Sequence, residues 1–217
     1  EYHIPIESHS AQIEQLESDA KTVIGVAKDG SPVGFFGIAD RVKEESAGAV
    51  ASLKRQGIDT AMVSGDNERT ARAIARTIGI TEVFARVLPD AKMDIVKNLQ
   101  SKGKKVAFVG DGINDAPALV QADLGIALGT GTDIAIEAGN IVLMKGNPLK
   151  AVEALTLSRR TFTAIQQNLF WAFFYNVAAI PLAAFGLLNP IIAAGAMAFS
   201  SISVVLNSLR IKRVGMK

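Results

Sequence analysis

The first two thirds of the chain alternate short apolar runs with amphipathic stretches about a dozen residues long. The run 106–109 predicts a buried strand, and the polar turn that follows it leads into a helix. In the stretch 68–78, alanines and isoleucines recur at helical spacing on one face. Strands that alternate with such helices favour an α/β fold with a parallel, doubly wound sheet. Further strands are predicted at 58–63, 83–87, 124–128 and 140–144, and further helices at 88–101 and 132–138.

Two runs near the amino end, 22–27 and 33–39, predict a pair of strands joined by a tight turn. The connection contains Asp29-Gly30, which is a strong hairpin signal. After the second strand, the acidic start of the next stretch predicts a helix that reaches about Gln56, with Asp40 as its N-cap.

The carboxy-terminal part has a different character. An amphipathic helix at 149–168 leads into two uncharged apolar stretches, 169–188 and 191–209. Each is long enough to cross about 30 Å of hydrocarbon, so a two-helix transmembrane hairpin is expected. Basic residues flank only the outer ends of the hairpin. By the positive-inside rule, both outer ends are then expected in the cytoplasm, on the same side as the α/β domain. The protein is therefore expected to be an integral, multi-pass membrane protein in contact with lipid.

Composition agrees with a protein that is partly in lipid. Of its 217 residues, 49% are hydrophobic, and the mean hydropathy is +0.27. The net charge is only +2, from 23 basic and 21 acidic residues, so no broad surface for a nucleic acid is indicated. There is no cysteine, which excludes both a disulfide framework and a thiolate metal site.

The richest candidate chemistry follows the strand at 106–109. Asp111 comes directly after it between two glycines, and Asn114 and Asp115 lie on the turn that follows. Oxygen ligands at the carboxyl end of a parallel strand suit Mg²⁺, which takes one or two carboxylates together with waters and phosphate oxygens. We expect Asp111 to be a direct ligand, with Asp115 and Asn114 holding the metal waters and the phosphoryl oxygens. The alternative is an ordinary strand-to-helix loop in which these side chains cap the helix.

A second candidate site follows the strand at 58–63. Ser64-Gly65-Asp66-Asn67 stands at the mouth of the helix 68–78. The Ser64 hydroxyl and free amides at a helix start suit a phosphate group, because unpaired N–H groups and the helix dipole both favour negative charge there. A plain capped helix is the competing interpretation.

The run Gly-Asp-Gly-Ile-Asn-Asp-Ala-Pro at 110–117 resembles the last phosphate-site motif of P-type ATPases, ion pumps whose phosphorylation domain has the haloacid-dehalogenase fold. The resemblance covers nearly the whole chain and implies Mg²⁺ and ATP as cofactors. It implies that Lys92 in Pro-x-x-Lys neutralises the transferring phosphoryl group, with Ser64 and Asp66 orienting it, and that Gly65 also contacts the nucleotide. Asp40 lies in an Asp-Arg-x-Lys run that the family carries at the hinge of its nucleotide-binding insertion, which gives Asp40 a role near the nucleotide.

The phosphorylated aspartate of this family is expected in Asp-Lys-Thr-Gly-Thr after a strand, and that run is absent from the sequence. The chain alone is therefore expected to be inactive and to need the rest of a pump: the actuator domain, the nucleotide-binding domain and the earlier spans. A copper chaperone is a further candidate partner. The expected domains are the end of the nucleotide-binding insertion at 1–39, the phosphorylation domain at 40–148, the linker helix at 149–168, and the membrane hairpin with its tail at 169–217.

Side chains within the two apolar stretches indicate the cargo. Neither stretch holds a carboxylate or a lysine, and a thioether with neutral oxygens suits the soft ion Cu(I). Tyr175, Asn176, Met197 and Ser201 are similar to residues in the last two spans of the copper-transporting branch of the heavy-metal P-type ATPases. Met197 and Ser201 are four apart and share one helix face. The alternatives are a zinc- or cadmium-transporting relative, and a membrane-tethered module of this fold that regulates without catalysing turnover.

Overall fold

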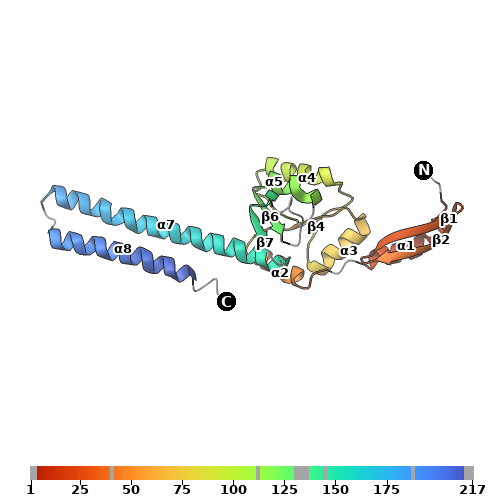
Figure 1. Cartoon of the computed structure of the whole chain (residues 1–217), viewed down its shortest axis with the longest axis horizontal. Coiled ribbons are helices and arrows are strands. Elements are labelled where there is room, and N and C mark those ends of the chain that lie inside the picture. The colour runs from red at the N-terminus through yellow and green to blue at the C-terminus, as the bar shows by residue number, and fades with distance from the viewer. Residues whose placement is uncertain are drawn as a thin grey trace. The chain divides into compact units, whose positions relative to one another are not determined.

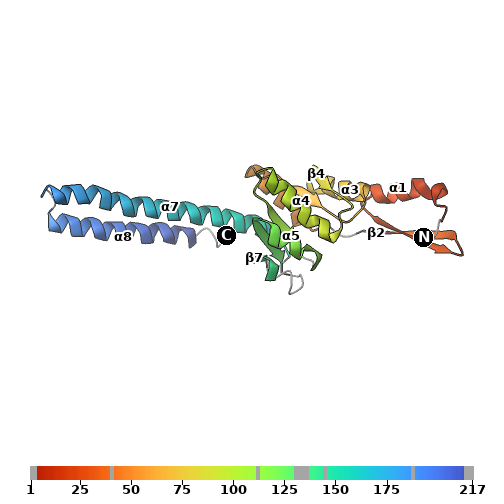
Figure 2. The same cartoon turned by 90° about the horizontal axis from the view of Figure 1, so that it is seen from above.

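The computed structural model describes residues 4–39, 42–110, 113–129, 137–143, 146–186 and 189–212. The chain forms two compact units, Glu1–Val152 and Glu153–Lys217. Figures 1 and 2 show that the first unit holds all the strands, whereas the second is helical.

The amino-terminal strands form the predicted hairpin. β1 (Thr22–Lys28) pairs with β2 (Ser31–Ile38) in an antiparallel register, and Asp29 and Gly30 in the turn have φ angles of 52° and 77°. Two left-handed residues in succession are what a two-residue hairpin turn of the I′ type requires. The helix α1 (Ser10–Ser18) contacts both strands. We call residues 4–38 the hairpin module.

The next segment is a strand, a helix and a parallel strand, as predicted. The helix α3 (Glu68–Ile78) starts at the N-cap Asn67 and ends at Gly79, which has a φ of 80°. The left-handed C-cap position favours glycine, and asparagine is a preferred N-cap, so local residue types explain both ends of this helix. Ala75 and Ile80 pack with Val50 of α2 into one buried cluster. The other elements here are α2 (Glu45–Arg55), β3 (Ala61–Val63) and β4 (Glu82–Phe84).

A parallel three-stranded sheet in the order β5-β6-β7 completes the first unit. The central strand β6 is buried on both faces, as expected for a parallel sheet covered by helices. On one face Ile126 packs with Ala151 at the start of α7 (Pro148–Ala184), and on the other Ala127 packs with Leu119 of α5 (Ala116–Gln121). The bounds are α4 (Pro89–Ser101), β5 (Ala107–Gly110), η2 (Ile113–Asp115), α5 (Ala116–Gln121), β6 (Leu124–Leu128) and β7 (Ile141–Leu143).

The predicted single doubly wound sheet is only partly confirmed. The parallel pairing is present, but β3-β4 and β5-β6-β7 are separate sheets among the described residues. Each of β3 and β5 therefore has one described neighbour and one open edge. The two strands differ in burial: Val109 on the edge strand β5 is 46% exposed, whereas its partner Ile126 on the central strand β6 is fully buried.

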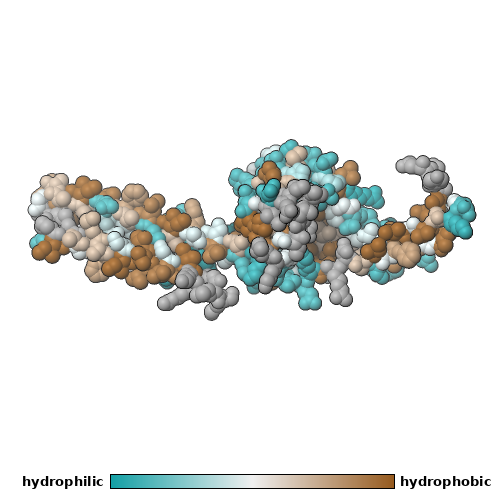
Figure 3. All heavy atoms as spheres, viewed as in Figure 1, coloured by the Kyte–Doolittle hydropathy of each residue, from teal (hydrophilic) through white to brown (hydrophobic). Residues whose placement is uncertain are grey.

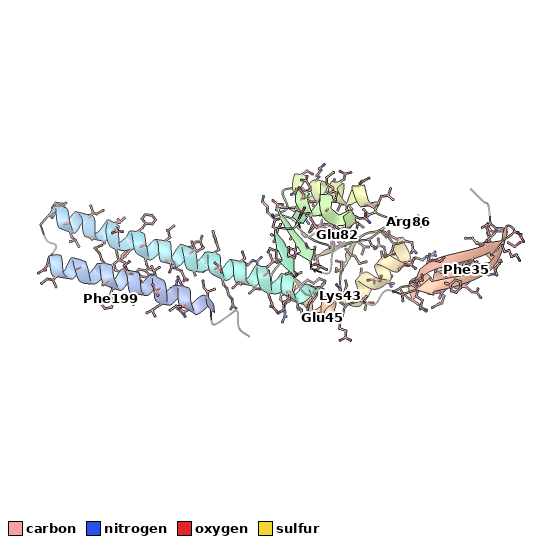
Figure 4. All side chains as sticks on the ribbon, viewed as in Figure 1. Phe35, Lys43, Glu45, Glu82, Arg86 and Phe199 are labelled. Carbon is pink, nitrogen blue, oxygen red and sulfur yellow. The ribbon has the colours of Figure 1, made fainter. Side chains whose placement is uncertain are left out.

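Two local predictions need correction or fall outside the described residues. The prediction that Asp40 is an N-cap is wrong, because α2 begins only at Glu45 with Glu44 in the N-cap position. Just before the helix, the Lys43 ammonium donates to the Gly146 carbonyl at 2.7 Å. Lys43 and Glu45 are labelled together at this end of α2 in Figure 4. Most of the helix predicted at 132–138 lies outside the described residues, which resume at 137.

The carboxy-terminal apolar stretches are confirmed as two helices, α7 (Pro148–Ala184) and α8 (Pro190–Lys212). The predicted linker helix and the first apolar stretch form one continuous helix, as their direct succession in the sequence suggests. Within the described residues, no helix combines the length and the apolar composition that crossing a bilayer requires. Near the outer ends of the pair, Asn168 donates to Ser208 at 3.0 Å, and Asn207 donates to Asn168 at 2.9 Å.

Candidate active site at the carboxyl edge of the strands

The carboxyl end of β5 is closed by a buried acid. Gly110 is the last residue of the strand, and Asp115 at the start of α5 is only 8% exposed. A Cβ atom at position 110 would lie 2.6 Å from the Asp115 carboxylate oxygen Oδ2. The absence of a side chain at Gly110 is therefore what lets this carboxylate pack over the end of the strand.

Lys92 supplies the charge that compensates this acid. It lies in the first turn of α4, which starts at Pro89, and its Nζ donates to Asp115 Oδ1 at 2.6 Å. Both side chains are shielded, with exposed fractions of 19% for Lys92 and 11% for Asp115. A charge-assisted bond of this length in a partly dry setting is a strong one, so the two groups are held in register. Figure 1 shows α4 and α5, which carry them, side by side.

The loop after β3 is tied to the segment after β4 by backbone hydrogen bonds. Ser64 N–H donates to the Phe84 carbonyl, and Val87 N–H donates to the Ser64 carbonyl at 3.0 Å. Arg86 N–H donates to the Asp66 carbonyl at 2.8 Å. Arg86 has a φ of 54°, which residues other than glycine rarely adopt. Because α4 starts directly after this segment, the Ser64 loop and Lys92 belong to one connected edge. Figure 4 labels Arg86 at this connection.

Asp66 is fully engaged within the first unit. Its Oδ2 accepts from the Ser64 hydroxyl at 2.7 Å, and its Oδ1 accepts from the Thr22 hydroxyl of β1 at 3.1 Å. The backbone N–H of Asp66 also donates to the Ser64 oxygen at 3.1 Å. Ser64 and Asp66, predicted to act together, are thus in direct contact.

The expectation of free amides at the start of α3 needs a correction. The Asn67 side chain accepts from the Thr70 N–H at 3.0 Å and so caps the helix. That amide is not available to a phosphate while the cap is in place. Asn67 is the N-cap because an amide side chain satisfies amides that have no partner inside the helix.

An acid whose pKa is lowered lies at the opposite end of the strands. Lys105, the Val106 N–H and the Gln100 amide all donate to Asp123 and hold the pKa of its carboxyl well below the usual range. Asp123 precedes β6, and Lys105 precedes β5. This cluster therefore links the amino ends of two strands, whereas Asp115 lies beyond the carboxyl end of β5.

Of the four remaining residues predicted from the sequence for the catalytic edge, the structure describes two. Asn114 is exposed beside Asp115, and Gly65 is exposed between Ser64 and Asp66. Asp111 and Asp40 lie outside the described residues. Among the residues that are described, no three His, Cys, Asp or Glu side chains are grouped to hold a metal ion.

The candidate copper residues are not brought together in the second unit. The Asn176 amide donates to Ala172 O at 2.9 Å, and the Ser201 hydroxyl donates to Met197 O at 3.2 Å, so each bonds its own helix. Tyr175 packs against Trp171 and Phe174 of the same helix. Met197 is 70% exposed. Within the described part of α7 and α8, no hydrogen bond or ring contact joins the candidates on α7 to those on α8.

Comparison with known proteins places this edge in a family. The model of haloacid dehalogenase-like hydrolases matches residues 5–123, more than half of the chain. The chain belongs to this family. The match includes Ser64, Lys92 and Asp115, so the hydroxyl, the cation and the carboxylate described above lie within the matched region of this haloacid dehalogenase-like hydrolase.

Individual relatives are pumps of which this haloacid dehalogenase-like chain covers a part. A protein of Mycobacterium tuberculosis (strain H37Rv) named "Probable copper-exporting P-type ATPase V" is 54% identical over 99% of this chain and 28% of its own length. An Enterococcus hirae protein named "Probable copper-importing P-type ATPase A" is 49% identical over 100% of this chain and 30% of its own. The chain thus spans less than a third of these relatives. A crystal structure of a zinc-transporting PIB-type ATPase in the E2.Pi state has a TM-score of 0.81 at 32% identity, over 96% of this chain and 34% of that one.

Sequence reasoning missed two residues that support the site. Thr22 reaches Asp66 across 44 residues of sequence, and nothing local to Thr22 marks that contact. In the sequence Gly110 stands out only as a glycine that flanks Asp111, whereas in the structure its lack of a Cβ makes room for Asp115. A glycine at the last position of a buried strand, followed shortly by an acid, is the signal that could have found it.

Proposed function

We propose that the chain is the carboxy-terminal part of an ATP-driven, copper(I)-translocating P-type ATPase. The observation that carries the proposal is the Lys92–Asp115 ion pair of 2.6 Å over the end of β5, joined through α4 to the Ser64 loop. A fixed cation, a buried carboxylate and a hydroxyl at one edge suit the transfer of a phosphoryl group, which depends on positioning and on neutralising charge. The names of the relatives supply the transport part of the proposal.

The donor set at this edge fits Mg²⁺. Asp115 and Asp111 would hold the ion, with Asn114 close by, and the ion would neutralise charge on the phosphate oxygens when bound. Two carboxylates suffice, because Mg²⁺ in phosphate sites takes its other oxygens from water and substrate. These are hard oxygen donors without a thiolate or imidazole, which agrees with Mg²⁺ rather than a softer metal.

The residues of this chain would act on the phosphoryl group in distinct ways. Lys92, held by Asp115, presents a fixed positive charge to the equatorial oxygens as charge develops during transfer. Ser64 donates its hydroxyl hydrogen to one oxygen. Asp40 and Gly65 are proposed to lie near the nucleotide. The attacking aspartate comes from another part of the pump, since Asp-Lys-Thr-Gly-Thr is absent here.

The open edges of β3 and β5 support a contribution from the rest of the pump. Both strands are parallel-paired on one side only among the described residues, and the candidate residues follow the carboxyl end of each. A further parallel strand seated against these edges would put its own carboxyl end beside Ser64 and Asp115. We assign the strand that bears the nucleophile to that place. It would also cover Val109.

The second unit is proposed to be the membrane part that carries copper. Large apolar side chains cover α7 and α8, as Figure 3 shows in brown, and Phe173, Val177, Ile180 and Phe199 are each more than 60% exposed. Polar residues such as Asn168 and Asn207 lower the apolar character of each helix. Such residues are expected where a membrane helix faces other helices of a larger bundle. The hairpin would thus be stable in the bilayer only as part of the complete pump, with its outer ends in the cytoplasm.

The cargo is proposed to be Cu(I), bound by Met197 together with Tyr175, Asn176 and Ser201 and completed by ligands from earlier spans. A thioether selects a soft ion. Zinc is the second candidate, favoured by the likeness to the zinc-transporting structure over 96% of this chain. The described part of α7 and α8 contains no Asp or Glu beyond Glu153, which disfavours a harder divalent cation.

Metal-dependent ATP hydrolysis tests the choice of cargo. The chain is combined with a complementing pump segment that carries the nucleophile and the earlier spans, and hydrolysis is followed in lipid vesicles with Cu(I) or Zn²⁺. We expect stimulation by Cu(I), and its loss in Met197→Leu. Phe199→Leu is the matched control, because Phe199 is on the same helix and 73% exposed against 70% for Met197. Figure 4 labels Phe199 on this helix.

Two results would contradict the assignment. If Zn²⁺ but not Cu(I) stimulated ATP hydrolysis, the chain would be assigned to the zinc-transporting branch. Equal Cu(I) stimulation in Met197→Leu and Phe199→Leu would remove Met197 from the cargo site.

A further inference from the structure

The hairpin module is bonded to the Ser64 loop by side chains that the catalytic proposal does not use. Arg69 Nη2 lies 2.7 Å from Glu14, and Arg69 Nη1 lies 3.3 Å from Glu17. The amide of Asn67 donates to the other oxygen of Glu17 at 3.0 Å. We call Glu14, Glu17, Asn67 and Arg69 the carboxylate clamp.

Two hydroxyl bonds extend the contact from α3 to the start of β1. The Thr70 hydroxyl donates to the Lys21 carbonyl at 3.0 Å, and Thr70 is buried. The Thr22 hydroxyl, one residue further on, donates to Asp66 at 3.1 Å. The clamp and these bonds together seat the hairpin module on the first turn of α3 and on the loop before it.

The seating reaches the Asp66 carboxylate, which also accepts the hydrogen of the Ser64 hydroxyl. Thr22 holds one oxygen of the Asp66 carboxylate, and the other oxygen accepts the Ser64 hydroxyl hydrogen at 2.7 Å. A serine has one hydroxyl hydrogen to donate. While that hydrogen points at Asp66, Ser64 offers a phosphate only lone pairs, and the neighbouring carboxylate repels it.

We infer that the clamped hairpin module is an autoinhibitory contact, which holds Ser64 on Asp66 and must open before Ser64 can bind a phosphoryl oxygen. The inference rests on the proposed function in one respect, that Ser64 is a phosphate ligand. Phosphate binds only the open state, so phosphate and the clamp compete through one equilibrium. The clamp is suited to opening, because Arg69 and Glu14 are about half exposed and such pairs are weak.

The charges of the clamp support one another. The carboxylates of Glu17 and Glu14 raise the pKa of the Arg69 guanidinium, so it stays charged at any physiological pH. Removing one partner leaves the others less well held, and the effects of Glu17 and Arg69 substitutions should not add. This non-additivity distinguishes a clamp from separate surface contacts.

Hydrogen exchange at residues 64–70 tests the contact in the full chain, in mild detergent with Mg²⁺. The double variant E14Q/E17Q is expected to exchange about three- to tenfold faster there, the range that the loss of exposed ion pairs gives. Its control is E7Q/E44Q, which makes the same change of charge at two glutamates whose side chains bond nothing in the described residues. Thr22→Val, with Thr77→Val as its control, releases Asp66 directly. The R69Q/E17Q variant should exchange no faster than the faster of its two single variants.

Inorganic phosphate is then titrated against the same peptides. The clamp variants should need about three- to tenfold less phosphate for half-protection of 64–70 than the unchanged chain. Unchanged exchange in E14Q/E17Q would overturn the inference, since no closed clamp would exist. Faster exchange with the same phosphate requirement would also overturn it, because the clamp would not compete with phosphate. Phosphate that protects no variant would reject the phosphate site of the proposed function and the inference with it.

Discussion

The substitution Gly110→Ala should damage both stability and the site, because the space for a Cβ is already filled by Asp115. The new atom would lie 2.6 Å from Oδ2, 2.8 Å from Cβ and 2.9 Å from Cγ of Asp115, where ordinary contact begins at 3.4 Å. All three atoms belong to one short side chain that is bonded to Lys92 at 2.6 Å. Asp115 cannot yield without loosening that bond, so we expect a loss of about 2 kcal/mol, within the usual range for overpacking.

Urea unfolding of the chain, followed by circular dichroism in mild detergent, measures this loss. Gly34→Ala is the control, because a Cβ at Gly34 meets nothing within 4 Å. Alanine also restricts the unfolded chain, which adds up to about 1 kcal/mol to both variants and cancels in the comparison. Saturating Mg²⁺ should raise the unfolding free energy of the unchanged chain, by about 2.7 kcal/mol at a hundred times its Kd, and raise that of Gly110→Ala much less. A difference below about 0.5 kcal/mol between the two alanine variants, or equal responses to Mg²⁺, would refute the close packing of Asp115 on Gly110.

Three further outcomes follow from single contacts. Lys92→Met should cost about 2–3 kcal/mol in urea unfolding, below the roughly 3–5 of a fully buried pair because Lys92 is 19% exposed, and adding Asp115→Asn should restore part of it. Asn67→Ala should cost about 1 kcal/mol by removing the cap on Thr70, whereas Asn98→Ala on an exposed helix face should not. The pKa of Asp123 lies below its value of about 3.9 in the unfolded chain. The contribution of Asp123 to the free energy of unfolding is therefore complete at neutral pH and is lost as the pH falls below about 4. Asp123→Asn should therefore be less stable at pH 7 and should show a weaker dependence on pH below about 4; an unchanged acid profile would count against this cluster.

The local elements could be predicted because their signals are local. The hairpin turn at Asp29-Gly30 and the helix between Asn67 and Gly79 are specified by residues with distinct backbone preferences, and the structure confirms both. The start of α2 could not be predicted in the same way. Asp40 is of a residue type that often caps helices, but α2 begins at Glu45 with Glu44 in the N-cap position, and no local pattern marks that start.

The candidate site shows the same division. The motifs around Lys92 and Asp115 indicate both as site residues, and the structure brings them into contact. The partnership of Thr22 with Asp66 depends on how the hairpin module packs on α3, which no local pattern encodes. The single sheet was expected from strand order alone. Among the described residues the structure has two separate parallel sheets, in which β3 and β5 are each paired on one side only.

The central claim is that the edge formed by Ser64, Lys92 and Asp115 completes the phosphoryl-transfer site of a pump. The most direct measurement combines this chain with a complementing segment that carries Asp-Lys-Thr-Gly-Thr, adds Mg²⁺ and radiolabelled ATP, and quenches with acid. We predict a hydroxylamine-sensitive acyl-phosphate on the complementing segment that requires this chain, is lost with Lys92→Met and survives Lys105→Met. Labelling that forms without this chain, or that Lys92→Met leaves unchanged, would contradict the account.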